Sequence, residues 1–146
     1  MATSLQDEIR DALNHARKSR NRLRTVVLST TLSEIRNREI SAGRSAGDDV
    51  VFGVIARGIK QRQDSVVQMR SAGREELALK EEEEVRILSE FLPPQMDEDQ
   101  VRALIRELVS QGATEMGPIM GKLMPRIRGR FDGKKANQIV REELVG

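Results

Sequence analysis

Apolar residues recur along the chain at the spacing of amphipathic helices. From Leu5 to Ala16 they follow one another at intervals that place them on one helical face. Ser4 stands directly before this face, where its hydroxyl can cap the first turn of a helix. Three further faces of the same kind predict three more helices, over residues 23–40, 51–69 and 77–92.

Turn and cap residues mark where these helices begin and end. The glycine-rich stretch 43–47 predicts a loop, and Asp48 is predicted to cap the third helix. Gly53 and Gly58 lie inside that helix, and because glycine there costs about 1 kcal/mol against alanine, both indicate close helix packing. The two prolines at 93–94 end the fourth helix, since proline removes a backbone donor. The inward residues of the fourth helix are expected to be Leu77, Val85, Leu88, Phe91 and Leu92.

A shorter unit follows the two prolines. Asp97 and Gln100 have the spacing of a capping box before an amphipathic face that ends at Gly112. A second face runs over residues 116–127, and Asp132 is predicted to cap a last helix. The chain is therefore predicted to be all-α, with an N-terminal helical domain of about four helices at 1–94 and a C-terminal three-helix domain at 95–146.

Composition excludes several classes of protein. The 146 residues contain no cysteine, which excludes thiolate zinc sites and cysteine nucleophiles. They contain a single histidine, His15, which disfavours a histidine-centred catalytic triad. No nucleophile stands with a base and a group to orient it, so we expect no catalytic residue, no metal site and no cofactor. No apolar run is long enough to cross a membrane, and the amino-terminal sequence has no apolar core of a secretory signal. We therefore expect a cytoplasmic protein.

Charge is unevenly distributed although the formal net charge is only +2. Residues 10–38 hold eight cations against two acids, and residues 75–90 hold seven glutamates against two cations. Residues 122–135 hold six cations against one acid. The acidic and basic segments can neutralise each other within a bundle, or they can present separate faces to charged partners.

The basic C-terminal stretch MGKLMPRIRGRFDGKKAN, residues 120–137, is the most informative segment. Pro125, Gly129 and Gly133 interrupt its helical pattern, which predicts that the arginines between them lie on or beside a turn. Turn amides, a helix N-terminus after Asp132 and mobile cations together make a phosphate-binding surface. The candidate RNA-binding residues are Lys122, Arg126, Arg128, Arg130, Lys134 and Lys135. The alternative is a solvated basic loop whose glycines serve only the backbone.

The sequence resembles the GatB/YqeY family over nearly its whole length. The resemblance rests on KQRQDSV (60–66), AGREELALKEEEEVRILSEFLPPQM (72–96) and MGPIMGKLMPRIRGRFDGKKANQIVREEL (116–144), together with their order and spacing. The chain is most similar to the stand-alone members. The resemblance implies an all-helical protein related to the tail of the B subunit of glutamine-dependent tRNA amidotransferases, a carbon–nitrogen ligase family. That tail contacts tRNA and does not hold the amide-transfer chemistry.

The family pattern can be placed residue by residue near the C-terminus. Its structural positions are Gly117, Gly121, Pro125, Gly129, Asp132, Gly133 and Asn137, with Leu123, Met124 and Arg130 also matching. Pro118 replaces what is often a lysine, which removes one possible phosphate contact. Phe131 replaces what is often a small residue and offers either a stacking face or a local anchor.

Two hypotheses follow, and an enzyme acting on its own is disfavoured. The first is a non-catalytic tRNA-binding accessory module, whose cations meet phosphates while the folded RNA is recognised by shape. The second is a helical protein–protein interaction module without RNA binding, which docks a partner through the acidic helix at 75–90.

Overall fold

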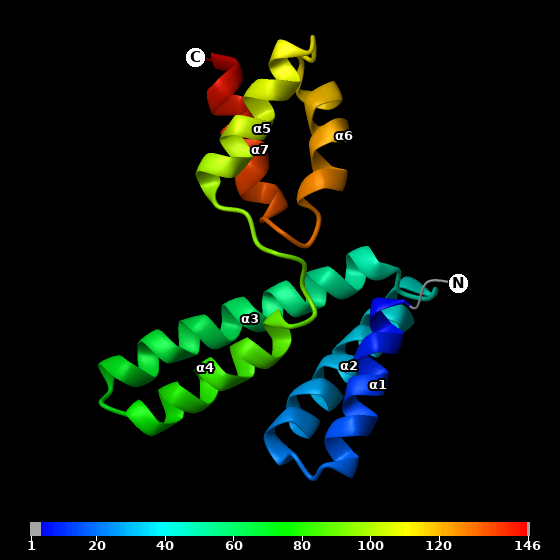
Figure 1. Cartoon of the computed structure of the whole chain (residues 1–146), viewed down its shortest axis with the longest axis vertical. Helices are drawn as coiled ribbons and strands as arrows, with labels where there is room; N and C mark the ends of the chain where they lie inside the picture. The colour runs from blue at the N-terminus through cyan, green and yellow to red at the C-terminus, as the bar shows by residue number, and fades with distance from the viewer. Residues whose placement is uncertain (1–3, 146) are drawn as a thin grey trace. The chain divides into compact units, whose positions relative to one another are not determined.

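The computed structural model describes residues 4–145, and within them the chain forms seven helices and no strand (Figure 1). The helices are α1 (Leu5–Lys18), α2 (Arg22–Ala42), α3 (Asp48–Ser71), α4 (Glu75–Ser89), α5 (Glu98–Ser110), α6 (Met116–Ile127) and α7 (Gly133–Val145). The predicted all-α class, with four helices followed by three, is confirmed. None of the described helices is long and apolar enough to cross a membrane.

The described residues form two compact units, the first ending at Leu92 and the second beginning at Pro93. The predicted domain boundary at residue 94 lies beside this division. The outer ends of the predicted domains, at residues 1 and 146, lie outside the described residues.

The first unit contains two helical hairpins, α1–α2 and α3–α4, and α2 contacts both helices of the second hairpin (Figure 1). Their apolar faces share one core made of Leu5, Ile9, Leu13, Val27, Leu28, Ile35, Val51, Val54, Ile55, Ile87 and Leu88. Ser4 caps α1 as predicted, since its Oγ accepts from the Asp7 amide at 3.1 Å.

Asp48 does not cap α3. Gly47 occupies the cap position, and Asp48 is the first helical residue. Its Oδ1 accepts a hydrogen bond from the Leu5 amide at 3.0 Å, so it satisfies a first-turn donor of α1 instead. The carboxylate therefore joins the start of α1 to the start of α3, two points that lie 43 residues apart in sequence.

Close packing occurs at one of the two glycines inside α3. A Cβ at Gly58 would lie 3.2 Å from the Leu88 Cδ1 of α4, which confirms the prediction there. A Cβ at Gly53 would meet no atom within 4 Å, so the prediction is wrong at that position.

The buried face of α4 differs in part from the predicted one. Leu88 is buried and Phe91 and Leu92 pack against the core as predicted, but Leu77 is 42% exposed, and Ala78, Glu84 and Ile87 are buried as well. The buried Glu84 has a charged partner, since the Arg62 Nε of α3 lies 3.6 Å from its Oε1. Arg62 is itself held by a 3.1 Å bond from its Nη1 to the Gly58 carbonyl.

The second unit is a three-helix bundle in which α5, α6 and α7 each contact the other two (Figure 1). Asp97 and Gln100 form the predicted capping box at the start of α5. The core contains Val101, Leu104, Ile105, Leu108, Ala113, Ile119, Leu123, Ile127, Ala136, Ile139 and Val140.

Candidate nucleic-acid interface

The basic C-terminal stretch lies where α6 ends and α7 begins. Pro125 was expected to interrupt the helix, but it lies within α6, which continues to Ile127. The helix continues through Pro125 with one backbone hydrogen bond fewer, because proline has no N–H to donate to the Gly121 carbonyl. Gly129 then has a φ of +72°, a left-handed conformation that favours glycine. Asp132 precedes α7, and its Oδ1 accepts from the Lys134 amide at 3.2 Å, as a cap does.

Three of the candidate cations are exposed side chains with no ion pair among the described residues. Lys122 and Arg126 lie one turn apart on α6, so they share a face of that helix. Lys134 lies in the first turn of α7. These three positions can present their charge to a ligand without breaking an internal contact.

Arg128 and Lys135 are exposed, but each interacts within the chain. Arg128 occupies the C-cap of α6. The Lys135 Nζ lies 3.7 Å from the Glu98 Oε2 and 6.0 Å from the centre of the Phe131 ring. Phe131 is half-buried against the core, so it serves as a local anchor.

Arg130 is tied to the segment that leads into the second unit. Its Nε donates to the Pro94 carbonyl at 2.8 Å, and its own carbonyl accepts from the Met96 amide at 2.9 Å. Gln95 adds a 2.8 Å bond from its Nε2 to the Gly129 carbonyl. The Arg130 guanidinium therefore holds the 94–96 segment against the end of α6, a role that the sequence did not indicate.

We use the name C-terminal basic patch for Lys122, Arg126, Arg128, Lys134 and Lys135. Beside it lies a cavity of about 310 Å³ whose lining includes Arg126, Arg130, Gln100 and Glu107. Of the structural motif residues, Gly133 begins α7, where a Cβ would lie 3.4 Å from the Met124 Cε. Asn137 is half-buried in α7. At Gly117 and Gly121 a Cβ would meet no atom within 4 Å, and nothing in the structure explains those two glycines.

Two other cations of the second unit, Arg102 and Arg106, have carboxylate partners. Arg102 of α5 contacts Glu98 at 2.9 Å and Glu143 at 3.2 Å, and Arg106 contacts Glu143 at 3.1 Å. The bond from Arg102 lowers the pKa of Glu98, and Arg106, followed by Arg102, lowers the pKa of Glu143. The pairs with Glu143 join α5 to α7, whereas the Arg102–Glu98 pair lies within α5. Both arginines therefore already have carboxylate partners within the chain.

The acidic helix α4 is partly neutralised by its neighbour α3. Arg70 of α3 contacts both Glu75 and Glu82, and its hydrogen bond lowers the pKa of Glu75. Consecutive glutamates of the run 81–84 point in different directions, since Glu84 is buried near Arg62 of α3, whereas Glu83 is exposed and contacts Arg86 of its own helix. Within residues 4–145, no group of three or more acidic or histidine side chains is placed to hold a metal ion.

Comparison with known proteins matches the chain to one family. The sequence profile of the family described as "Yqey-like protein" matches residues 6–144. The protein named "Altered inheritance of mitochondria protein 41, mitochondrial" from Pyrenophora tritici-repentis is 26% identical over an alignment of 138 positions that covers 88% of this chain and 76% of that protein. The protein of the same name from Vanderwaltozyma polyspora is 29% identical over an alignment of 119 positions that covers 76% of this chain and 64% of that protein.

A shorter match connects the chain to part of an enzyme. A glutamyl-tRNA(Gln) amidotransferase subunit of Thermococcus sibiricus is 37% identical over 68 residues. Those residues are 47% of this chain but only 11% of that protein. The similarity therefore covers a small module of a much larger protein.

The prediction of a cytoplasmic location is wrong by these comparisons, because two of the relatives carry a mitochondrial designation in their names. The prediction relied on the missing apolar core of a secretory signal. A mitochondrial targeting segment has no such core, since it is amphipathic, rich in arginine and poor in acids.

Proposed function

The chain belongs to the YqeY-like protein family, and we propose that it acts as a non-catalytic tRNA-binding accessory module. The C-terminal basic patch contacts phosphates of the folded RNA, and any amide-transfer chemistry belongs to another protein. The observation that carries the proposal is that Lys122, Arg126 and Lys134 are exposed and have no ion pair among residues 4–145.

The chemistry of these side chains fits a phosphate surface. Lysine supplies a compact positive charge, and the arginine guanidinium can donate two parallel hydrogen bonds to one phosphate. Phe131, the aromatic residue of this stretch, is half-buried against the core, so in this proposal the bases are not read by stacking and the RNA is recognised by its shape. The similarity to an amidotransferase subunit named for glutamyl-tRNA(Gln) supports tRNA as the folded RNA.

The test is the salt dependence of tRNA binding by the full chain. End-labelled bulk tRNA is titrated with protein between about 50 and 200 mM salt, and log Kd is plotted against log salt. Five phosphate contacts give a slope of roughly 4 in magnitude. In the triple variant Lys122→Gln, Arg126→Gln, Lys134→Gln, the magnitude should fall by roughly 2 to 3.

A matched control variant separates this patch from general charge loss. Arg57→Gln, Lys60→Gln, Lys80→Gln removes three exposed cations of α3 and α4 that have no ion pair among the described residues. Its slope should equal that of the unmodified chain. Equal slopes in both triple variants, or no tRNA binding by the unmodified chain at about 50 mM salt, would refute the proposed function.

A second candidate function, a protein-docking module, is favoured by one observation. Leu77 and Leu79 of the acidic helix α4 are 42% and 51% exposed, and Val67 of the neighbouring helix α3 is 66% exposed. Exposed apolar side chains among acids suit a partner with a mixed basic and apolar face. Proteins that co-purify with the chain after nuclease treatment, and are lost in Leu77→Asp, Leu79→Asp, would favour this function.

A further inference from the structure

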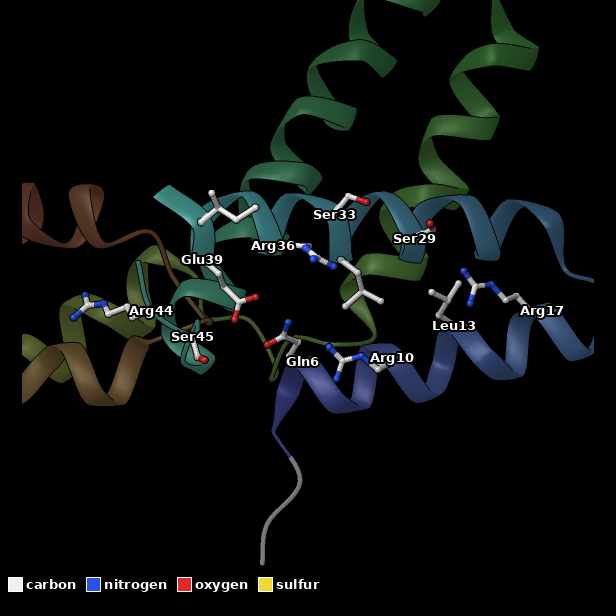
Figure 2. A pocket seen from close by; sticks show the side chains of 12 residues that line it. Gln6, Arg10, Leu13, Arg17, Ser29, Ser33, Arg36, Glu39, Arg44 and Ser45 are labelled. Atoms are coloured by element: carbon white, nitrogen blue, oxygen red, sulfur yellow. The ribbon is translucent and has the colours of Figure 1, made fainter. Parts of the chain in front are cut away.

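An arginine-lined groove lies between α1 and α2 in the first unit (Figure 2). Its cavity of about 700 Å³ is lined by arginines from three places: Arg10 and Arg17 of α1, Arg36 of α2, and Arg44 of the following loop. Figure 2 shows Arg10, Arg17 and Arg36 pointing into the space between the two helices. The groove thus gathers three cations of the basic segment 10–38 together with Arg44, and the C-terminal basic patch includes none of them.

Three of these four arginines lack carboxylate partners, and Arg10 is paired with Asp7. Within residues 4–145, Arg17, Arg36 and Arg44 have no ion pair, and all three are exposed. Of the residues that line the groove, Glu39 alone is acidic, and its Oε2 accepts from the Ala46 amide at 2.9 Å. That bond holds the loop after α2 and is not directed at an arginine. Like charges gathered in one groove repel each other, and a bound anion removes this repulsion.

The spacing of the arginines favours an extended ligand with several negative groups. Arg10 and Arg17 are seven residues apart on α1, a distance of roughly 10 Å along the helix axis. Two guanidinium groups that far apart bind successive anionic groups more readily than a single phosphate.

The other lining groups indicate which polyanion fits. Guanidinium groups match the geometry of phosphate oxygens, and the hydroxyls of Ser29, Ser33 and Ser45 add donors of the kind that contact phosphate backbones. No aromatic side chain lines the groove, so bases have no stacking platform there.

We infer that the α1–α2 groove is a second binding site, which takes the phosphate backbone of single-stranded RNA without regard to sequence. The site is separate from the C-terminal basic patch, because it lies in the first unit and uses different residues. It goes beyond the proposed function, since it requires no folded tRNA.

The test uses a labelled oligouridylate of about twelve nucleotides, which has no fold of its own, and the full chain. The groove variant is Arg17→Gln, Arg36→Gln, Arg44→Gln, which spares Arg10 because its Nη1 contacts Asp7 at 3.1 Å. Three phosphate contacts give a log–log slope near 2 in magnitude, so binding by the unmodified chain should weaken roughly 20-fold between 50 and 200 mM salt. The groove variant should lose most of this dependence.

Two triple variants serve as controls. The Arg57, Lys60 and Lys80 variant and the Lys122, Arg126 and Lys134 variant carry the same change in charge, and both should bind the oligouridylate as the unmodified chain does. Circular dichroism at 222 nm verifies that every variant keeps its helices.

Several results would overturn the inference. They are no oligouridylate binding by the unmodified chain, an unchanged slope in the groove variant, an equal loss in the α3–α4 control, or displacement of the RNA by polyglutamate as readily as by polyuridylate. Binding of tRNA that depends on the C-terminal basic patch, without binding of oligouridylate, would overturn this inference and leave the proposed function intact. The reverse pattern would overturn the proposed function alone.

Discussion

Two arginines four residues apart in the C-terminal stretch should respond to substitution in opposite ways. Arg126 is exposed on α6 and makes no side-chain bond among the described residues. Arg130 is half-buried and donates from its Nε to the Pro94 carbonyl at 2.8 Å. We therefore expect Arg126→Ala to reduce RNA binding and Arg130→Ala to reduce stability.

The size of each effect follows from these contacts. A hydrogen bond to a charged group contributes about 1.5–3 kcal/mol, and partial exposure of Arg130 reduces this to about 1 kcal/mol. A loss of that size lowers the Tm of a small unit by roughly 4–8 °C. Arg126→Ala should change the free energy of unfolding by less than about 0.5 kcal/mol, since it is a surface change that breaks no internal contact. It should instead reduce the salt slope of tRNA binding by about 0.9.

Thermal unfolding followed at 222 nm, and tRNA binding measured below both midpoints, separate the two roles. Hydrogen exchange at the Met96 amide adds a local probe, because this amide donates to the Arg130 carbonyl at 2.9 Å. Exchange there should accelerate about fivefold in Arg130→Ala and not in Arg126→Ala. The reasoning is refuted if Arg130→Ala unfolds and exchanges like the unmodified chain, or if it flattens the salt slope as much as Arg126→Ala does.

Two further predictions concern stability alone. Gly53→Ala should stabilise the chain by about 1 kcal/mol, because a Cβ there meets no atom within 4 Å, whereas Gly58→Ala should give no gain or a loss, because its Cβ would lie 3.2 Å from Leu88. Urea unfolding measures both, and equal gains would contradict close packing at Gly58. Arg102 lowers the pKa of Glu98, and Arg106 lowers that of Glu143. At mildly acidic pH the folded chain therefore keeps these carboxylates ionised, whereas the unfolded chain binds protons to them. Their contribution to stability is full near neutral pH and is lost as the pH falls through the folded pKa values, so Arg102→Met should flatten the acid-side fall of Tm below about pH 5. A Tm profile with the same slope in both proteins would contradict it.

Local signals in the sequence predicted most of the helices correctly. Each helix repeats apolar residues at a helical period, and the capping box at Asp97 is a pattern within four residues. Errors arose where a small or polar residue occupies the buried face. On α4, Ala78 and Glu84 are buried while Leu77 is exposed, so a face assigned by large apolar residues alone is misplaced.

Roles that depend on distant contacts could not be predicted from local sequence. Asp48 stands between a predicted loop and a predicted helix, which is the pattern of a cap. Its Oδ1 nevertheless accepts a hydrogen bond from the Leu5 amide, 43 residues away in sequence. Arg130 lies in a basic stretch, yet its Nε donates to a carbonyl 36 residues away. In both cases the residue type is suited to the local role, and the three-dimensional fold supplies a different partner.

The chain has a net charge of only +2, although many of its cations have no ion pair among the described residues. Glutamates on α4 and α7 contact arginines such as Arg70 and Arg102. The opposite charges of each pair cancel, so these pairs contribute little to the electrostatic potential at a distance. Cations without ion pairs among the described residues occur in the arginine-lined groove, as with Arg36, and in the C-terminal basic patch, as with Arg126. A net charge of +2 gives weak long-range attraction, so affinity for a polyanion must come from contacts made after encounter. The relevant quantity is therefore the number of phosphates neutralised at each site, and the slope of log Kd against log salt measures that number directly.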